Sequence, residues 1–127
     1  AWITDPPGMV NVFDEGVVFD MDRERFITEQ VEAAMKNRWP KAARFYQVHD
    51  FSHIANYDSD ARAAMMTWGR QRLQEIELAI LVAPPMNVVV RMGVRTAIAL
   101  LHVGGMKIEL GGSLEEAVAK LRLRPAP

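Results

Sequence analysis

The chain has 127 residues, half of which are hydrophobic, and this is enough to bury the core of one domain. Fifteen basic residues nearly balance sixteen acidic residues. Because a dedicated nucleic-acid-binding protein usually has a basic excess, we expect no nucleic-acid partner. Cysteine is absent, which excludes disulfides, thiol catalysis and cysteine-ligated metal sites.

Neither a targeting segment nor a membrane span is visible in the sequence. Residues 1–7 lack the basic region and the long apolar run of a secretory signal. The longest apolar region, residues 86–103, is interrupted by the polar side chains Asn87, Arg91, Arg95 and His102. Such a region makes a poor membrane span and a good buried helix. We therefore expect a cytoplasmic protein.

The first element is expected to be a β-hairpin. Residues 9–13 alternate between apolar and polar side chains, as a half-buried strand does, after an N-terminal extension at residues 1–8. Residues 14–16 have the composition of a hairpin turn. Residues 17–19 would then return beside the first strand.

A helix is expected next, with Asp22 as its cap and Glu24 in its first turn. It should end at Trp39, because the residue before a proline avoids helical geometry. Its expected apolar stripe is Phe26, Ile27, Val31, Ala34 and Met35.

The rest of the chain alternates strands with helices. Residues 44–51 and the continuous apolar run 77–82 are expected to be strands of the sheet, and residues 106–110 alternate as an edge strand. Further helices are expected after Asp58, from Pro84-Pro85 to about His102, and after Ser113, followed by a C-terminal tail at residues 122–127. This order predicts an α/β sandwich with a mixed, mostly parallel sheet of about five strands and four helices.

The stretch from residue 50 to residue 61 is the most informative part of the chain. It reads Asp50-Phe51-Ser52-His53-Ile54, three further residues, and then Asp58-Ser59-Asp60-Ala61. This spacing resembles the central signature of STAS domains, the family of anti-sigma factor antagonists and their SpoIIAA-like relatives. The closing pattern of a long helix, a short strand and Ser113-Leu114-Glu115-Glu116-Ala117 is also similar. The resemblance implies one STAS-like domain over residues 1–127.

The resemblance also implies a non-enzymatic regulatory or scaffold module that acts by protein–protein interaction. In switching members of that family, the second serine of the signature is phosphorylated by a partner kinase. Asp60 occupies this position here, so the usual phospho-switch is not expected. Ser59, one residue earlier, is the remaining candidate phosphoacceptor. About 100° of helical rotation separates the two positions, so Ser59 would point in a different direction.

The expected partner is a regulatory or kinase-like protein, or a second copy of the chain in a homodimer. The third helix is apolar almost all round, which suggests burial on more than one side. The alternative is that the termini fold over it. The expected partner-binding residues are Asp58, Ser59, Asp60, Arg62, Arg91 and Arg95.

The alternative function is the binding of a small nucleotide or lipid-like ligand. Such ligands bind in crevices at the carboxyl ends of strands, which would involve His53, Tyr57 and Met86 here. A cavity between the sheet and the third helix would favour a ligand, whereas a filled core with a flat apolar outer face would favour a partner. No cofactor or metal is expected, because strand geometry separates His49 and His53 by ~13 Å. Catalytic activity is not expected either, because the sequence contains no nucleophile elbow.

Overall fold

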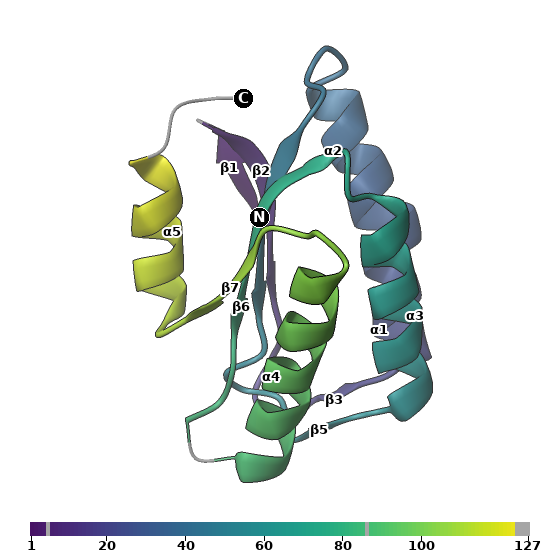
Figure 1. Ribbon diagram of the computed structural model, residues 1–127, viewed down its shortest axis with the longest axis vertical. Coiled ribbons are helices and arrows are strands. Elements are labelled where there is room, and N and C mark those ends of the chain that lie inside the picture. Colours follow the sequence, from purple (N-terminus) through teal and green to yellow (C-terminus); the bar gives the residue numbers. More distant parts are fainter. Residues whose placement is uncertain (5, 86, 124–127) are drawn as a thin grey trace.

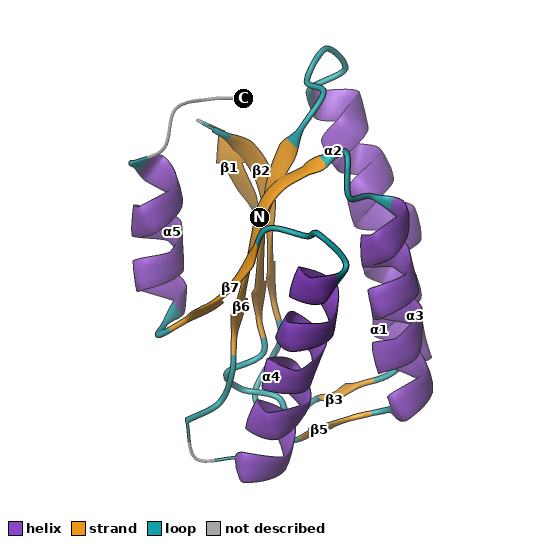
Figure 2. Ribbon diagram, in the orientation of Figure 1, coloured by secondary structure: helices purple, strands orange, loops and turns teal. Residues whose placement is uncertain are grey.

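The computed structural model describes residues 1–4, 6–85 and 87–123. Five strands form one sheet, in the order β1 (Trp2–Thr4), β2 (Pro7–Val12), β4 (Phe45–Asp50), β6 (Ile76–Val82) and β7 (Ile108–Gly111). β1 runs antiparallel to β2, whereas the other neighbours are parallel (Figure 2). The helical segments are α1 (Met21–Arg25), the π-helical turn η1 (Phe26–Val31), α2 (Glu32–Arg38), α3 (Ser59–Gln71), α4 (Val88–Val103) and α5 (Leu114–Arg122). α1, η1 and α2 follow one another without a break, so the described residues contain four helices.

The sheet lies between two layers of helices (Figure 1). α5 covers one face, and the helices from α1 to α4 cover the other. All six residues of β4 are buried, because this strand lies in the middle of the sheet and both of its faces are covered. The predicted α/β class with a mixed five-stranded sheet and four helices is therefore confirmed. β7 is an edge strand, as its alternation predicts.

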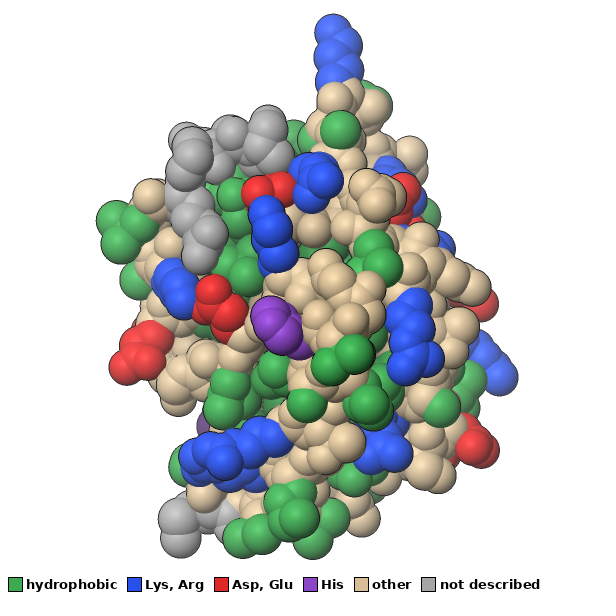
Figure 3. Space-filling model, viewed as in Figure 1, with side chains coloured by type: hydrophobic (Ala, Val, Ile, Leu, Met, Phe, Trp, Pro, Cys, Tyr) green, Lys and Arg blue, Asp and Glu red, His purple; other side chains and the backbone are tan. Residues whose placement is uncertain are grey.

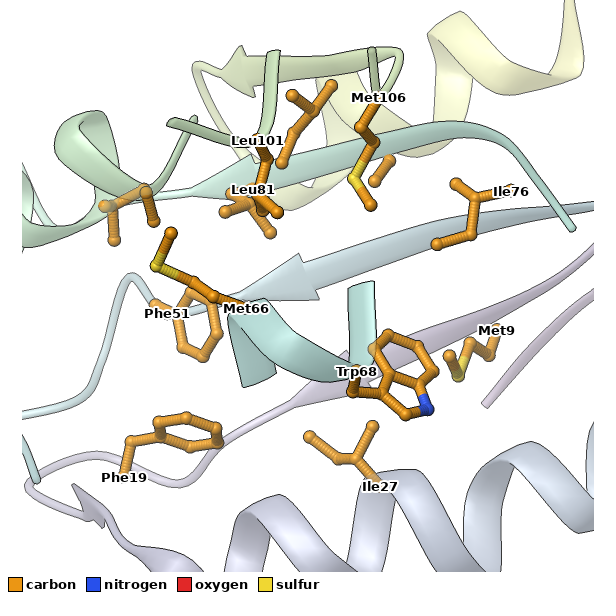
Figure 4. Close-up of a cluster of buried hydrophobic side chains, with 14 of the residues drawn as sticks. Met9, Phe19, Ile27, Phe51, Met66, Trp68, Ile76, Leu81, Leu101 and Met106 are labelled. Carbon is orange, nitrogen blue, oxygen red and sulfur yellow. The ribbon is translucent and has the colours of Figure 1, made fainter. Parts of the chain in front are cut away.

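The two faces of the sheet have separate apolar cores. The smaller core lies under α5 and includes Val48, Ile80 and Leu121. The larger core lies under α3 and α4 and includes Trp68 and Leu81. Figure 4 shows part of the larger core, where side chains from strands and helices converge.

The predicted hairpin at the N-terminus is wrong. β2 pairs with β1, so residues expected to be an extension form the edge of the sheet. Val18–Phe19 forms β3, which pairs in parallel with β5 (Asn56–Tyr57) in a separate two-stranded sheet. The turn at Gly16, whose φ is +79°, donates its N–H to the carbonyl of His53 at 2.9 Å. The turn therefore directs the chain onto the loop before β5 and does not close a hairpin.

The first helix differs from its prediction in its capping residue and in which of its residues face the core. Asp20, not Asp22, caps it by accepting the backbone N–H of Arg23 at 3.0 Å. Phe26 is 61% exposed and Ala34 is also exposed, whereas Ile27 and Met35 are buried. The π-helical turn explains the difference, because its extra residue per turn rotates the positions around it away from the 3.6-residue stripe.

The caps of the later helices agree with the sequence signals. Asp58 accepts the backbone N–H of Asp60 at 2.9 Å, and Ser113 accepts that of Glu116 at 3.1 Å. α4 begins after Asn87, two residues beyond the Pro84-Pro85 pair, and Asn87 Oδ1 accepts a backbone N–H at its start. None of the helices in the described ranges combines the length and apolar content needed to cross a bilayer.

Candidate functional site

The larger core contains a cavity of about 80 Å³. Its floor is formed by β4, β6 and β7, and its roof by α3 and α4. Figure 4 shows Met66, Leu81, Leu101 and Met106 reaching toward this region from different elements. These residues, and nearly all the others that line the cavity, present apolar side chains. The walls are Phe19, Gln47, His49, Phe51, Ile54, Tyr57, Arg62, Met65, Met66, Trp68, Gly69, Ile76, Ala79, Leu81, Val90, Gly93, Val94, Ala97, Leu101, Met106 and Ile108.

Three of the residues that line the cavity on α3 and α4 are small. Gly69 on α3 and Gly93 and Ala97 on α4 line the cavity and are buried. A glycine in a helix interior costs about 1 kcal/mol relative to alanine, so a buried pair of them calls for a packing reason. A methyl group at Gly69 would lie 3.0 Å from the Met106 side chain. One at Gly93 would lie 2.6 Å from the ring of Tyr57.

The floor of the cavity holds a buried polar pair on β4. His49 Nδ1 lies 3.2 Å from the amide nitrogen of Asn11, and His49 Nε2 lies 3.1 Å from Oε1 of Gln47. The amide nitrogen of Asn11 is a donor and the Gln47 oxygen is an acceptor, which assigns a neutral ring with its proton on Nε2. Burial lowers the pKa of His49 to about 4. This imidazole is therefore neutral and fully paired at pH 7.

The mouth of the cavity lies at Tyr57, Arg62 and Met65. These three lining residues are partly exposed, whereas every other lining residue is buried. The Tyr57 ring packs against Gly93 of α4, and the Arg62 guanidinium lies 5.5 Å from the centre of that ring. The mouth thus opens between β5 and the first turns of α3. Tyr57 was expected as a ligand-binding residue, whereas Arg62 was expected as a partner-binding residue.

The acidic start of α3 lies beside this mouth and outside the cavity. Ser59 and Asp60 are exposed, while Asp58 is partly buried and uses its carboxylate as the helix cap. Asp60 therefore presents its charge to solvent. Ser59 is the first residue of the helix, where the free backbone N–H groups favour negative charge.

Arg91 and Arg95 both lie on α4. Neither lines the cavity, and Arg95 is exposed. Five apolar side chains of this helix are also exposed, namely Val88 (66%), Val89 (63%), Met92 (63%), Leu100 (48%) and Val103 (87%). Figure 3 shows apolar side chains and Lys or Arg side chains gathered over the N-terminal end of α4. We call these five residues the outer face of α4.

The remaining expected ligand residues are not brought together. His53 is exposed in the loop after β4 and does not line the cavity. Met86 lies outside the described residues. Within the ranges that the structure describes, no group of three or more histidines and carboxylates is arranged to hold a metal ion. His49 and His53 accordingly have separate environments, one buried and one exposed.

A buried acidic residue fixes α2 against α3 next to the cavity. Glu32 accepts hydrogen bonds from Trp68 Nε1 and from Arg72 Nε, the latter at 2.8 Å, and pairs with Lys36 at 3.0 Å. Burial opposes ionisation of Glu32, but the hydrogen bonds from Arg72, Lys36 and Trp68 outweigh it, so the net effect is a lowered pKa. Because Trp68 also lines the cavity, this cluster holds one of its walls in place.

Sequence reasoning missed most of the cavity. Gln47 and His49 stand two apart in an expected strand, and this was the available signal of a polar pair on one face. The buried glycines of α3 and α4 were the second signal. Comparisons of the chain with protein-family models, with curated proteins and with solved structures found no match.

Proposed function

We propose that this domain binds a small apolar ligand in the cavity beneath α3 and α4. The observation that carries the proposal is a space of about 80 Å³ with almost wholly apolar walls and a mouth at partly exposed residues. Protein interiors are normally close-packed, and the walls of a void lose dispersion contacts. An apolar ligand restores these contacts and removes its own surface from water.

The size of the cavity limits the ligand. An apolar protein cavity of ~150 Å³ accepts benzene, so the present space of about 80 Å³ accepts only a few carbon atoms as it stands. Methionine side chains are unbranched and adaptable, and Met65, Met66 and Met106 all line the walls. Movement of these side chains would lengthen the cavity for an alkyl chain.

Calorimetric titration with 1-hexanol tests the proposal. The wild-type chain is expected to bind hexanol with one-to-one stoichiometry and a negative heat-capacity change, the mark of apolar burial. Ala97→Leu, which places a larger side chain in the cavity, is expected to abolish this binding. Ala99→Leu is the matched control, because Ala99 is exposed on the same helix. Absence of binding to the wild type, or equal binding to both variants, would refute the proposal.

We also propose a second function, recognition of a protein partner through the outer face of α4 and the start of α3. The five exposed apolar side chains of that face favour it, because such patches on small domains mark interaction sites. Arg91 and Arg95 on the same helix, and the exposed Asp60 at the start of α3, carry charge that would orient a partner. This is the regulatory role implied by the STAS-like spacing, with Ser59 as an accessible phosphoacceptor.

Self-association is the form of this second function that can be tested first. Sedimentation velocity over a range of concentrations should show a reversible dimer if a second copy covers the outer face. Met92→Lys should shift the equilibrium toward the monomer, whereas Thr67→Lys, an exposed position on α3, should leave it unchanged. A monomer at every concentration excludes the homodimer, and equal effects of the two variants place its interface elsewhere.

We also propose that the α/β fold is of the STAS type, which is a more specific assignment than the α/β class. The parallel order β2-β4-β6-β7 with alternating helices is compatible with it, as is the capped helix start at Asp58. Phosphorylation of Ser59 by a kinase, tested with the Ser59→Ala variant as control, would support the regulatory side of the assignment.

A further inference from the structure

We propose, on the basis of the ligand-binding function above, that the ligand is an amphiphile with a carboxylate head group. The carboxylate binds Arg62 at the mouth, and the apolar tail fills the cavity. The site would thus recognise short- or medium-chain aliphatic acids, or aromatic acids of similar size, in their ionised form.

The state of Arg62 is the first observation behind this assignment. Its Nε is buried, and among the residues that the structure describes it has no hydrogen-bond acceptor. A buried donor without an acceptor costs free energy, so such a group in a folded protein calls for an explanation. A ligand oxygen at this nitrogen supplies the missing acceptor.

The surroundings of Arg62 leave its charge available. In the described part of the chain, no carboxylate forms an ion pair with its guanidinium. Asp58, four residues earlier on the chain, is engaged as the helix cap, and Asp60 is exposed. The guanidinium lies 5.5 Å from the centre of the Tyr57 ring, a contact that holds it over the mouth without neutralising it.

On the opposite wall, the ring nitrogens of His49 and the indole nitrogen of Trp68 are already paired. The ring nitrogens of His49 are both paired, with Asn11 and Gln47, so the floor offers no free imidazole proton. Trp68 donates its indole N–H to Glu32. The cavity therefore has a polar end at Arg62 and apolar walls beyond it, which is the distribution of an amphiphile with one head group.

A carboxylate fits this end better than other charged groups. The planar guanidinium pairs with carboxylates through parallel hydrogen bonds, and charge-assisted bonds of this kind are about twice as strong as neutral ones. An ammonium group would be repelled by Arg62. A doubly charged phosphate carries a larger desolvation cost in a partly buried mouth that offers one cation.

Head-group selectivity of the wild-type chain gives the direct test. Calorimetric titrations at pH 7.5 would compare hexanoate, 1-hexanol, hexylamine and hexyl phosphate, which share one tail. Hexanoate is expected to bind about tenfold more tightly than hexanol, and hexylamine most weakly. Hexanol binding without a preference for hexanoate would overturn this inference and leave the apolar-ligand function standing. Tighter binding of hexyl phosphate would overturn the carboxylate assignment, and binding of none of the four would overturn both proposals.

Variants of Arg62 test whether the preference for hexanoate over hexanol depends on this residue. Arg62→Met keeps a long apolar stem and removes the charge, so it should lose about tenfold in hexanoate affinity and retain hexanol affinity. Arg70→Met, at an exposed position of the same helix, is the matched control and should retain both. An Arg62→Met variant that still prefers hexanoate over hexanol would overturn the inference. Binding of hexanol shows that a variant is folded. The comparison of head groups on the wild-type chain tests the inference even if a variant does not fold.

Discussion

At the scale of single residues, two side chains of the larger core have environments with measurable consequences. His49 is an ionisable group held neutral by burial on β4, and its ring nitrogens pair with Asn11 and Gln47. Tyr57 closes the mouth of the cavity against a glycine of the neighbouring helix. Through His49, the stability of the larger core depends on pH. Through Tyr57, the packing of α4 affects access to the cavity.

We expect stability to fall on acidification because of His49. Its pKa is about 4 in the folded chain and ordinarily 6.5, so the unfolded chain binds more protons between these values. The contribution of the neutral His49 to the free energy of unfolding is complete above pH 6.5 and is lost as the pH falls toward 4. It amounts to about 1 kcal/mol between pH 7.5 and pH 5.5. Urea unfolding at these two pH values would measure it.

The His49→Gln variant should lack this part of the pH dependence, whereas His102→Gln, at an exposed position, should keep it. The window above pH 5.5 lies above the ordinary pKa of carboxylates, so Glu32 does not contribute to it. A wild-type chain equally stable at both pH values would show that His49 is not held neutral in the folded state.

We expect Gly93→Ala to displace the Tyr57 ring. Alanine should stabilise the helix by about 1 kcal/mol over glycine, but its methyl group would lie 2.6 Å from the ring. The clash should cancel this gain in the wild-type background and not in a Tyr57→Ala background. A double-mutant cycle of urea unfolding free energies should give a coupling of about 1 kcal/mol or more. Zero coupling would mean that the ring does not rest on Gly93.

At the scale of elements, the walls of the cavity are positioned by contacts between segments distant in sequence. Glu32 joins α2 to Trp68 and Arg72 of the α3 region. Asn87 donates its side-chain amide to the carbonyl of Ala55 at 2.8 Å, which joins the start of α4 to the loop before β5. These contacts hold the roof of the cavity over the sheet although the core beneath it is incompletely filled.

Loss of the Glu32 charge should loosen this roof. Glu32→Gln keeps the shape but removes the charge-assisted hydrogen bonds, so we expect a loss of about 2 kcal/mol in unfolding free energy. Urea unfolding at pH 7.5 would measure it, with Glu29→Gln as the control at an exposed position. A loss no larger than that of the control would mean that Glu32 does not join α2 to α3.

The sequence predicted those elements whose signals are local. The caps at Asp58 and Ser113 were found because the capping side chain and its target lie within three residues. The pairing of Val18–Phe19 with Asn56–Tyr57 was missed because no local pattern encodes contact between short, distant strands. The phase of the first helix was missed because a π-helical turn has no clear sequence signal.

At the scale of the whole molecule, the domain is a three-layered α/β structure (Figure 1) with an apolar core on each face of the sheet, and the larger core contains a cavity. From the sequence, Tyr57 was expected at a ligand site and Arg62 at a partner site, because both lie close to the predicted helix start at Asp58. The sequence did not reveal the cavity, which is lined by residues of β4, β6, β7, α3 and α4 that are distant in sequence. The cavity and the outer face of α4 are the two surfaces for which we propose a function.

Methionine methyl NMR distinguishes these two surfaces directly. Met65, Met66 and Met106 line the cavity, whereas Met92 lies on the outer face of α4. With methyl-labelled methionine and hexanoate, we expect intermolecular nuclear Overhauser effects from the alkyl chain to Met65, Met66 and Met106, and none to Met92. Contacts to Met92 alone, or to no methionine at saturating hexanoate, would contradict ligand binding inside the domain.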